Sequence, residues 1–344
     1  DPIAAVTVDY DGEIRSATDP DIGADEYDVS LLDYRVQVTP ESHLLHALPD
    51  TMIAYYYEVK NIGANNDSYN LTVTGAGWTT MIFDSSGSTQ ITATNVLSPN
   101  ESQWVFVRHC VPATAGQGEL DSGDFIVTSV NSGSVSDTSS FTTTIMLGGT
   151  FDIGGGNNDF TTVEGAVDSL GLFGIYQPIT LNVYPGTYDG IVTIDGNLIY
   201  GMGEMNPIIL QANPGSTDPV IIRNTMGGSG EGYGISLLGA SYVTIEGLEI
   251  ENCSEGGIYL GQSGVDYCDH VYIRNNYLHS ITGTYAIYNN RCDTGEIIGN
   301  EIEGCSYGIR HFFSDDFLIA NNMVYDQSNT GISGYYGNNA EYYY

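Results

Sequence analysis

Three aspartates recur at nearly constant spacing in the second half of the chain. Asp269, Asp293 and Asp315 each precede a short run of apolar residues, and they are 24 and 22 residues apart. If this spacing is one turn of a repeat, the carboxylates stack at about 4.8 Å, the separation of neighbouring strands. Stacked carboxylates repel unless water, salt or a cation screens them, and oxygen ligands suit Ca²⁺. The column is a candidate calcium site, with a solvated acidic edge as the open alternative.

A cysteine directly precedes two of these aspartates. Cys268 and Cys292 would lie in adjacent turns with Cα atoms about 4.8 Å apart, which is within disulfide reach. We expect a Cys268–Cys292 disulfide, which would suit an oxidising, extracellular setting, and the alternative is a reduced stacked pair. Cys253 and Cys305 are two turns apart, about 10 Å, and are expected to be buried thiols.

A third set combines aromatic rings with a guanidinium. Tyr259, Tyr288 and Arg310 each follow an apolar residue of the repeat, so strand alternation points them outward. Such rings beside an arginine can stack on sugar rings or on a neighbouring protein. Exposed tyrosines also stabilise sheets as cross-strand pairs, so ligand contact and a structural role both stay open.

The repeat that must position these residues is visible as columns of apolar side chains. One turn cannot bury its apolar face alone, so successive turns must stack. Asn276, Asn300 and Asn322 fall at one position of the repeat and predict a ladder of side-chain amides. The inward columns are Ile245, Ile273, Ile297 and Ile319, then Ile250, Leu278, Ile302 and Val324, then Ile258, Ile287, Ile309 and Ile332.

The start of this repeat region resembles a known kind of fold. Val163, Ala166, Val167 and Leu170 form one face of a short helix, and the sequence "ITLNVYPGTYDGIVTIDGNLIYGMG" follows. A short helix before V-x-P-G-x-Y and I-x-G-x-G resembles the entry to right-handed parallel β-helices of the pectate-lyase and pectinesterase kind. We therefore expect a β-helix with a capping helix over residues 148–344.

The preceding segment has the pattern of a β-sandwich. Several stretches such as "MIAYYYEVKNIG" alternate apolar and polar residues between turn signals. The order "VKNIG…NDSYNLTVTG…GW", then "LSPNES…VPATA", resembles the immunoglobulin-like modules of large bacterial secreted proteins. We expect an all-β chain, with an immunoglobulin-like sandwich over residues 28–147 that carries no catalytic motif.

Residues 1–27 resemble the closing coil of bacterial surface β-helix proteins, although here they come first. The sequence has D-x-D-G-x-x-R and then D-I-G-A-D-E-Y, while "TGISGYYGNNAEYYY" stops within the repeat pattern. We expect this segment to complete the open β-helix of a neighbouring unit, head to tail. An arbitrary fragment with unrelated neighbours is the alternative. The assembly segment is Asp21, Ile22, Gly23, Ala24, Asp25, Glu26 and Tyr27.

Charge restricts the partners. The chain has 43 acidic and 8 basic residues, a formal charge of −35, which argues against binding to nucleic acid. No stretch of about 18 apolar residues is available to span a membrane. We expect an extracellular or cell-surface protein, with Ca²⁺ as the one suggested cofactor and with copies of itself or polysaccharide as partners.

Catalysis is the competing interpretation, because the entry motif resembles pectin-active families. A lyase needs a base, and Arg274 has only Glu246, Ile298 and Ala320 in its column, with neither a second base nor a carboxylate pair. A hydrolase needs clustered carboxylates on one strand face. We therefore favour a non-enzymatic structural protein, a module of a stiff acidic rod. A polysaccharide-binding adhesin and a pectate-lyase-like enzyme stay as alternatives.

Overall fold

The structure, a computed structural model, describes residues 33–156, 158–225, 232–261, 267–337 and 339–343. The expected assembly segment, Asp21–Tyr27, lies outside these ranges. The chain divides into two compact units, one formed by residues up to Thr114 with Leu120–Thr143, the other by Ala115–Glu119 with Thr144–Tyr344. Apart from Ala115–Glu119, the second unit begins at Thr144, four residues before the expected boundary at 148.

The first unit packs two four-stranded sheets around one core. Tyr55, Tyr57 and Val59 alternate with more exposed residues and are fully buried, with Phe125 and Phe141 from the other sheet. This alternation forms strands with one apolar face. One sheet has the strand order β1 (Val36–Thr39), β3 (Met52–Asn61), β6 (Ser102–Cys110), β5 (Thr79–Asp84). The other sheet has the strand order β2 (Ser42–Ala47), β8 (Ser136–Ile145), β7 (Leu120–Ser129), β4 (Tyr69–Thr74).

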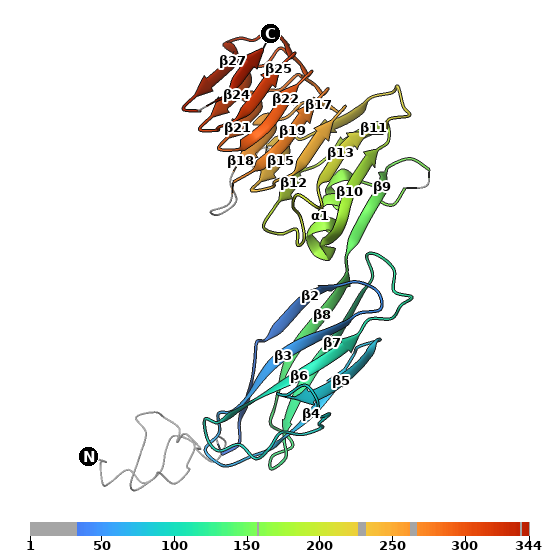
Figure 1. Cartoon of the computed structure of the whole chain (residues 1–344), viewed down its shortest axis with the longest axis vertical. Helices are drawn as coiled ribbons and strands as arrows, with labels where there is room; N and C mark the ends of the chain where they lie inside the picture. Colours follow the sequence, from blue (N-terminus) through green and yellow to red (C-terminus); the bar gives the residue numbers. More distant parts are fainter. Residues whose placement is uncertain (1–32, 157, 226–231, 262–266, 338, 344) are drawn as a thin grey trace, which may run out of the picture. The chain divides into compact units, whose positions relative to one another are not determined.

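The second unit is a parallel β-helix with three sheets, and Figure 1 shows its strands stacked in chain order. We call the sheets long, glutamate and tyrosine. The long sheet is β9 (Leu147–Ile153), β10 (Ile175–Val183), β13 (Ile208–Ala212), β16 (Val243–Glu246), β19 (Asp269–Arg274), β22 (Asp293–Ile298), β25 (Phe317–Ala320), β28 (Glu341–Tyr343).

The other two sheets have six strands each. In both, a strand pairs with the strand that comes three strands earlier in the chain. The glutamate sheet is β11 (Gly186–Asp189), β14 (Val220–Arg223), β17 (Glu249–Glu251), β20 (Tyr277–His279), β23 (Glu301–Glu303), β26 (Met323–Tyr325). The tyrosine sheet is β12 (Val192–Asp195), β15 (Tyr233–Leu238), β18 (Gly256–Gly261), β21 (Tyr285–Asn290), β24 (Tyr307–Phe312), β27 (Thr330–Tyr335).

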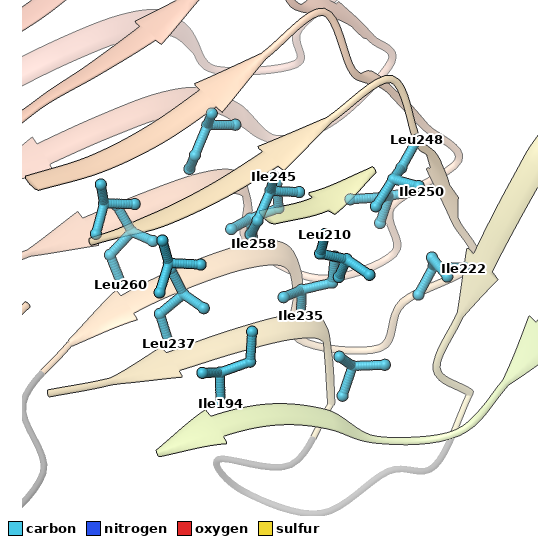
Figure 2. Close-up of a cluster of buried hydrophobic side chains, with 14 of the residues drawn as sticks. Ile194, Leu210, Ile222, Ile235, Leu237, Ile245, Leu248, Ile250, Ile258 and Leu260 are labelled. Carbon is cyan, nitrogen blue, oxygen red and sulfur yellow. The ribbon is translucent and has the colours of Figure 1, made fainter. Parts of the chain in front are cut away.

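The inward columns expected from the sequence are confirmed. Ile245 pairs with Ile273, Ile273 with Ile297, and Ile297 with Ile319, and the other two columns are also in register. Side chains from all three sheets meet in the interior, as Figure 2 shows for Leu210, Ile250 and Leu260. The core is therefore a stack of layers, one for each coil.

A helix and an amide ladder complete this unit. α1 (Val163–Phe173) buries Val163, Ala166, Val167 and Leu170, the face expected from their spacing, and the Thr162 hydroxyl accepts a hydrogen bond from the Gly165 N–H. The asparagine ladder is also confirmed. Nδ2 of Asn276 donates to Oδ1 of Asn300, and Nδ2 of Asn300 donates to Oδ1 of Asn322, each at 3.0 Å.

Candidate functional site

The tyrosine sheet brings Tyr259, Tyr288 and Arg310 into one outward column. Tyr259 on β18 pairs with Tyr288 on β21, and Tyr288 pairs with Arg310 on β24. All three are half-buried, and their immediate chain neighbours on these strands point into the core. The register expected from the sequence therefore holds, and their role in ligand contact stays a prediction.

Aromatic rings surround the Arg310 guanidinium. Its Cζ atom lies 5.4 Å from the ring centroid of Tyr285, 5.3 Å from that of Phe312 and 5.2 Å from that of Tyr335. These distances are within the range of cation–π attraction. We call Tyr259, Tyr285, Tyr288, Arg310, Phe312 and Tyr335 the tyrosine–arginine face.

Arg310 differs from two other arginines of the β-helix in its ionic partners. Arg223 pairs with Asp189 at 2.9 Å, and Arg274 pairs with Glu296 at 2.7 Å. Within the described ranges, Arg310 forms no ion pair, and its buried Nε has no hydrogen-bond partner. The face thus has a cation that no carboxylate of the described residues neutralises.

The tyrosines of this face are linked ring to ring. The centroids of Tyr285 and Tyr288 are 4.7 Å apart, and those of Tyr259 and Tyr288 are 5.6 Å apart. Burial raises the pKa of the Tyr288 phenol, while the nearby Arg310 charge acts in the opposite direction. The phenol is neutral at physiological pH, and the face offers ring surface, hydroxyls and one guanidinium. This combination suits a sugar with a negative group.

The aspartate column lies where each coil enters the long sheet. Asp269 and Asp293 are register partners at the first positions of β19 and β22, and the Asp315 N–H donates to Oδ1 of Asp293 at 2.7 Å. Oδ2 of Asp269 lies 3.1 Å from Nδ1 of His270. The three side chains do not form a convergent group of ligand atoms among the described residues. Calcium binding here stays a prediction.

The cysteines of adjacent coils lie together as free thiols. Cys268 and Cys292 are both buried and are not joined by a disulfide in this structure, so the expected disulfide stays a prediction. A hydrogen bond with Cys292 lowers the pKa of Cys268, whereas burial raises that of Cys292. Cys253 and Cys305 are buried thiols, as expected, and burial raises the pKa of each to about 11.

The glutamate sheet holds a polar network that the sequence analysis missed. Nε2 of His279 lies 2.9 Å from Oε1 of Glu249 and 3.7 Å from Oε2 of Glu251. Two coils further on, a second Glu-x-Glu pair accepts hydrogen bonds from tyrosines: Tyr277 donates to Glu303 at 2.7 Å, and Tyr325 donates to Glu301 at 2.8 Å. The outward side of this sheet therefore alternates carboxylates with groups that carry protons.

The signal for this network was present in the repeat. Counted from Ile245, Ile273, Ile297 and Ile319 of the first inward column, the fifth following residue is the inward one of the next strand. The fourth and sixth residues must then point outward. These positions are Glu249 and Glu251, Tyr277 and His279, Glu301 and Glu303, and Met323 and Tyr325.

Comparison with known proteins agrees with the fold of the second unit. Residues 233–343 match a family model described as a right handed beta helix region. No curated protein matches the chain. In the part of the chain that the structure describes, no helix is long and apolar enough to cross a membrane.

Solved structures show only distant likeness. PapD-like domain 7 of human CEP192 is 12% identical, covering 39% of this chain and 99% of that one, with a TM-score of 0.25. The catalytic domain of a GH87 alpha-1,3-glucanase in complex with nigerose is 11% identical, and the match covers 86% of this chain and 66% of that chain, with a TM-score of 0.21. The secreted serine protease VesC from Vibrio cholerae is 13% identical, and the match covers 35% of this chain and 24% of that chain, with a TM-score of 0.23. At such scores, none of these bears on function.

Proposed function

We propose that this protein is an extracellular surface module that binds acidic polysaccharide, without cleaving it, through the tyrosine–arginine face. The observation that carries the proposal is Arg310, a guanidinium among three aromatic rings without a carboxylate partner in the described ranges. In a chain with a formal charge of −35, carboxylates are plentiful. A cation left without one is therefore available for a ligand's acidic group.

The chemistry of the face selects the ligand class. A guanidinium binds a carboxylate or sulfate through parallel hydrogen bonds, and its planar geometry fixes the orientation of the bound group. The neighbouring rings supply apolar surface for the faces of sugars. Uronates and sulfated sugars combine both features, whereas neutral glycans can use only the rings.

The overall negative charge opposes the approach of such a polymer only at long range. At physiological ionic strength the Debye length is about 8 Å, so distant surface carboxylates are largely screened. The guanidinium and its ligand would be in direct contact. We therefore expect binding to be weak at low salt and to strengthen initially as salt is added.

Affinity electrophoresis with a panel of glycans tests the proposal. Polygalacturonate, alginate and a sulfated galactan should retard the protein, while neutral glucans should not, and the polymers should keep their length. Equal retardation by neutral glucans would contradict the acidic specificity. Shortening of any polymer would support the enzymatic alternative.

Head-to-tail assembly with copies of itself is a separate proposal, supported by the sequence of Asp21–Tyr27 alone. It would make the protein a module of a stiff acidic rod. Sedimentation of the full chain and of a variant without residues 1–27 tests it. Loss of assembly with an intact sandwich is expected, and unchanged rods in the truncated variant would contradict it.

A further inference from the structure

We infer that Glu249, Glu251 and His279 form a binding site for a divalent transition-metal cation of the Zn²⁺ class. One carboxylate oxygen from each glutamate and one imidazole nitrogen lie within 4.8 Å of one another. This site lies on the glutamate sheet and is distinct from both the aspartate column and the tyrosine–arginine face.

The spacing of the three ligand atoms fits a small tetrahedral ion. Zinc bonds of about 2.0–2.1 Å to nitrogen and oxygen place neighbouring ligand atoms about 3.3 Å apart at tetrahedral angles. The Nε2 atom of His279 lies 2.9 Å from Glu249 and 3.7 Å from Glu251, which brackets that separation. Small side-chain rotations would therefore admit the ion, and solvent would supply the fourth ligand.

The fold holds the imidazole in place. The backbone of β20 pairs with that of β17, Glu251 directly opposite His279. Nδ1 of His279 lies 3.1 Å from the Ser280 hydroxyl, and the Tyr277 ring stacks on the imidazole with centroids 4.4 Å apart. A metal-binding histidine usually donates a hydrogen bond from its other ring nitrogen, and the Ser280 hydroxyl can accept it. The Nε2 atom thus faces the two carboxylates.

The second Glu-x-Glu pair provides an internal comparison. Glu301 and Glu303 accept hydrogen bonds from the Tyr277 and Tyr325 hydroxyls and have no histidine between them. The Glu249 pair has the imidazole instead, and Oε1 of Glu251 also lies 3.7 Å from Nη1 of Arg223. Imidazole with carboxylates suits Zn²⁺ and its neighbours, whereas Ca²⁺ and Mg²⁺ prefer oxygen ligands alone.

Calorimetric titration of the chelator-treated full chain with Zn²⁺ tests this site. We expect one saturable site with micromolar or tighter affinity, and Co²⁺ should give the visible absorption of tetrahedral cobalt. His279→Gln and Glu249→Gln should weaken binding by roughly 10–100-fold or more. The matched control is the double variant Glu301→Gln/Glu303→Gln, which should bind normally.

A measurement on the wild type does not depend on the variants folding. Zn²⁺ should protect His279 from modification by diethyl pyrocarbonate, as read by mass spectrometry, while His270 should stay reactive. The inference is overturned if the wild type does not bind Zn²⁺ below millimolar concentrations, or if Zn²⁺ leaves His279 as reactive as before. Equal loss of binding in the Glu301→Gln/Glu303→Gln variant would contradict the assignment to Glu249 and Glu251.

Discussion

The guanidinium carbon of Arg310 lies 5.4 Å from the ring centroid of Tyr285, which is on the neighbouring strand of the tyrosine sheet. The contact joins two coils of the β-helix through a cation and a ring. No carboxylate of the described residues pairs with this cation. An arginine fixed by rings keeps its hydrogen-bond donors free, so less ordering is needed when an acidic ligand binds.

Replacing the ring should weaken ligand binding more than stability. Tyr285→Leu removes one wall beside Arg310, and we expect several-fold weaker retardation by polygalacturonate. The free energy of unfolding should fall by only about 1 kcal/mol, the usual worth of a surface aromatic contact. Tyr200→Leu, on an exposed tyrosine before β13, is the matched control and should leave binding unchanged. Equal effects of the two variants would contradict the role of Tyr285.

The asparagine ladder should carry a measurable part of the stability of the β-helix. Oδ1 of Asn300 accepts two hydrogen bonds from Asn276, one from its backbone N–H and one from its Nδ2. Nδ2 of Asn300 donates to the Ile273 carbonyl. Asn300→Ala leaves buried groups without partners, at about 1–3 kcal/mol each. We expect a total loss of about 3 kcal/mol or more.

Urea unfolding followed by far-UV circular dichroism measures this loss. The control is Asn329→Ala, an exposed amide that donates to the Tyr307 hydroxyl, with an expected change of about 0.5 kcal/mol or less. If both variants unfold at the same urea concentration, the ladder does not stabilise the fold as the contacts imply.

The stability of the sandwich should fall as the pH is lowered, in two steps. Burial lowers the pKa of His109, so the unfolded chain takes up that proton first, below about pH 6.5. Burial acts to raise the pKa of Asp121, but hydrogen bonds from Gly77, Trp78 and His109 outweigh it and the pKa is lowered. Asp121 therefore stabilises the sandwich fully at pH values above the pKa that its carboxyl has in the unfolded chain. This stabilisation is lost as the pH falls below about 4.

Tryptophan fluorescence isolates this unit, because Trp78 and Trp104 are the only tryptophans and both lie in the sandwich. Urea midpoints should therefore be measured by fluorescence from pH 7 to pH 3. The difference in urea midpoint between wild type and Asp121→Asn separates the contribution of the His109–Asp121 pair from the general effect of net charge. This difference should shrink as the pH is lowered. A difference that does not vary with pH would contradict the proposed linkage.

The stacked thiols should be joined by oxidation more readily than any other pair. Cys268 and Cys292 lie in adjacent coils, whereas Ile281 occupies the coil between Cys253 and Cys305. Mass analysis of unreduced, alkylated protein from an oxidising compartment should find one Cys268–Cys292 crosslink. Full alkylation of both thiols under those conditions would show that the reduced pair persists.

The fold could be predicted further than the site because its signals are periodic. The isoleucine columns, the buried face of α1 and the asparagine ladder follow from spacing alone, since parallel stacking converts spacing into contact. The outward direction of Tyr259, Tyr288 and Arg310 follows in the same way.

What spacing does not determine is which polar side chains meet. Arg274 pairs with Glu296, which is not in its own column but in that of Tyr272. The meeting of His279 with Glu249 likewise depends on side-chain rotamers, and so does the lack of a hydrogen-bond partner for Nε of Arg310 among the residues that the structure describes. The Cys268–Cys292 thiols show the same limit, because strand spacing allows both a disulfide and a reduced pair.

The most direct test of the account is the affinity of wild type and Arg310→Gln for polygalacturonate, measured at physiological ionic strength. Arg274→Gln is the matched control, because Arg274 already pairs with Glu296. A hydrogen bond to a charged group contributes about 1.5–3 kcal/mol, so we predict a loss of roughly tenfold or more for Arg310→Gln. The Arg274→Gln variant should bind like wild type. Equal affinity of wild type and Arg310→Gln would contradict the proposal.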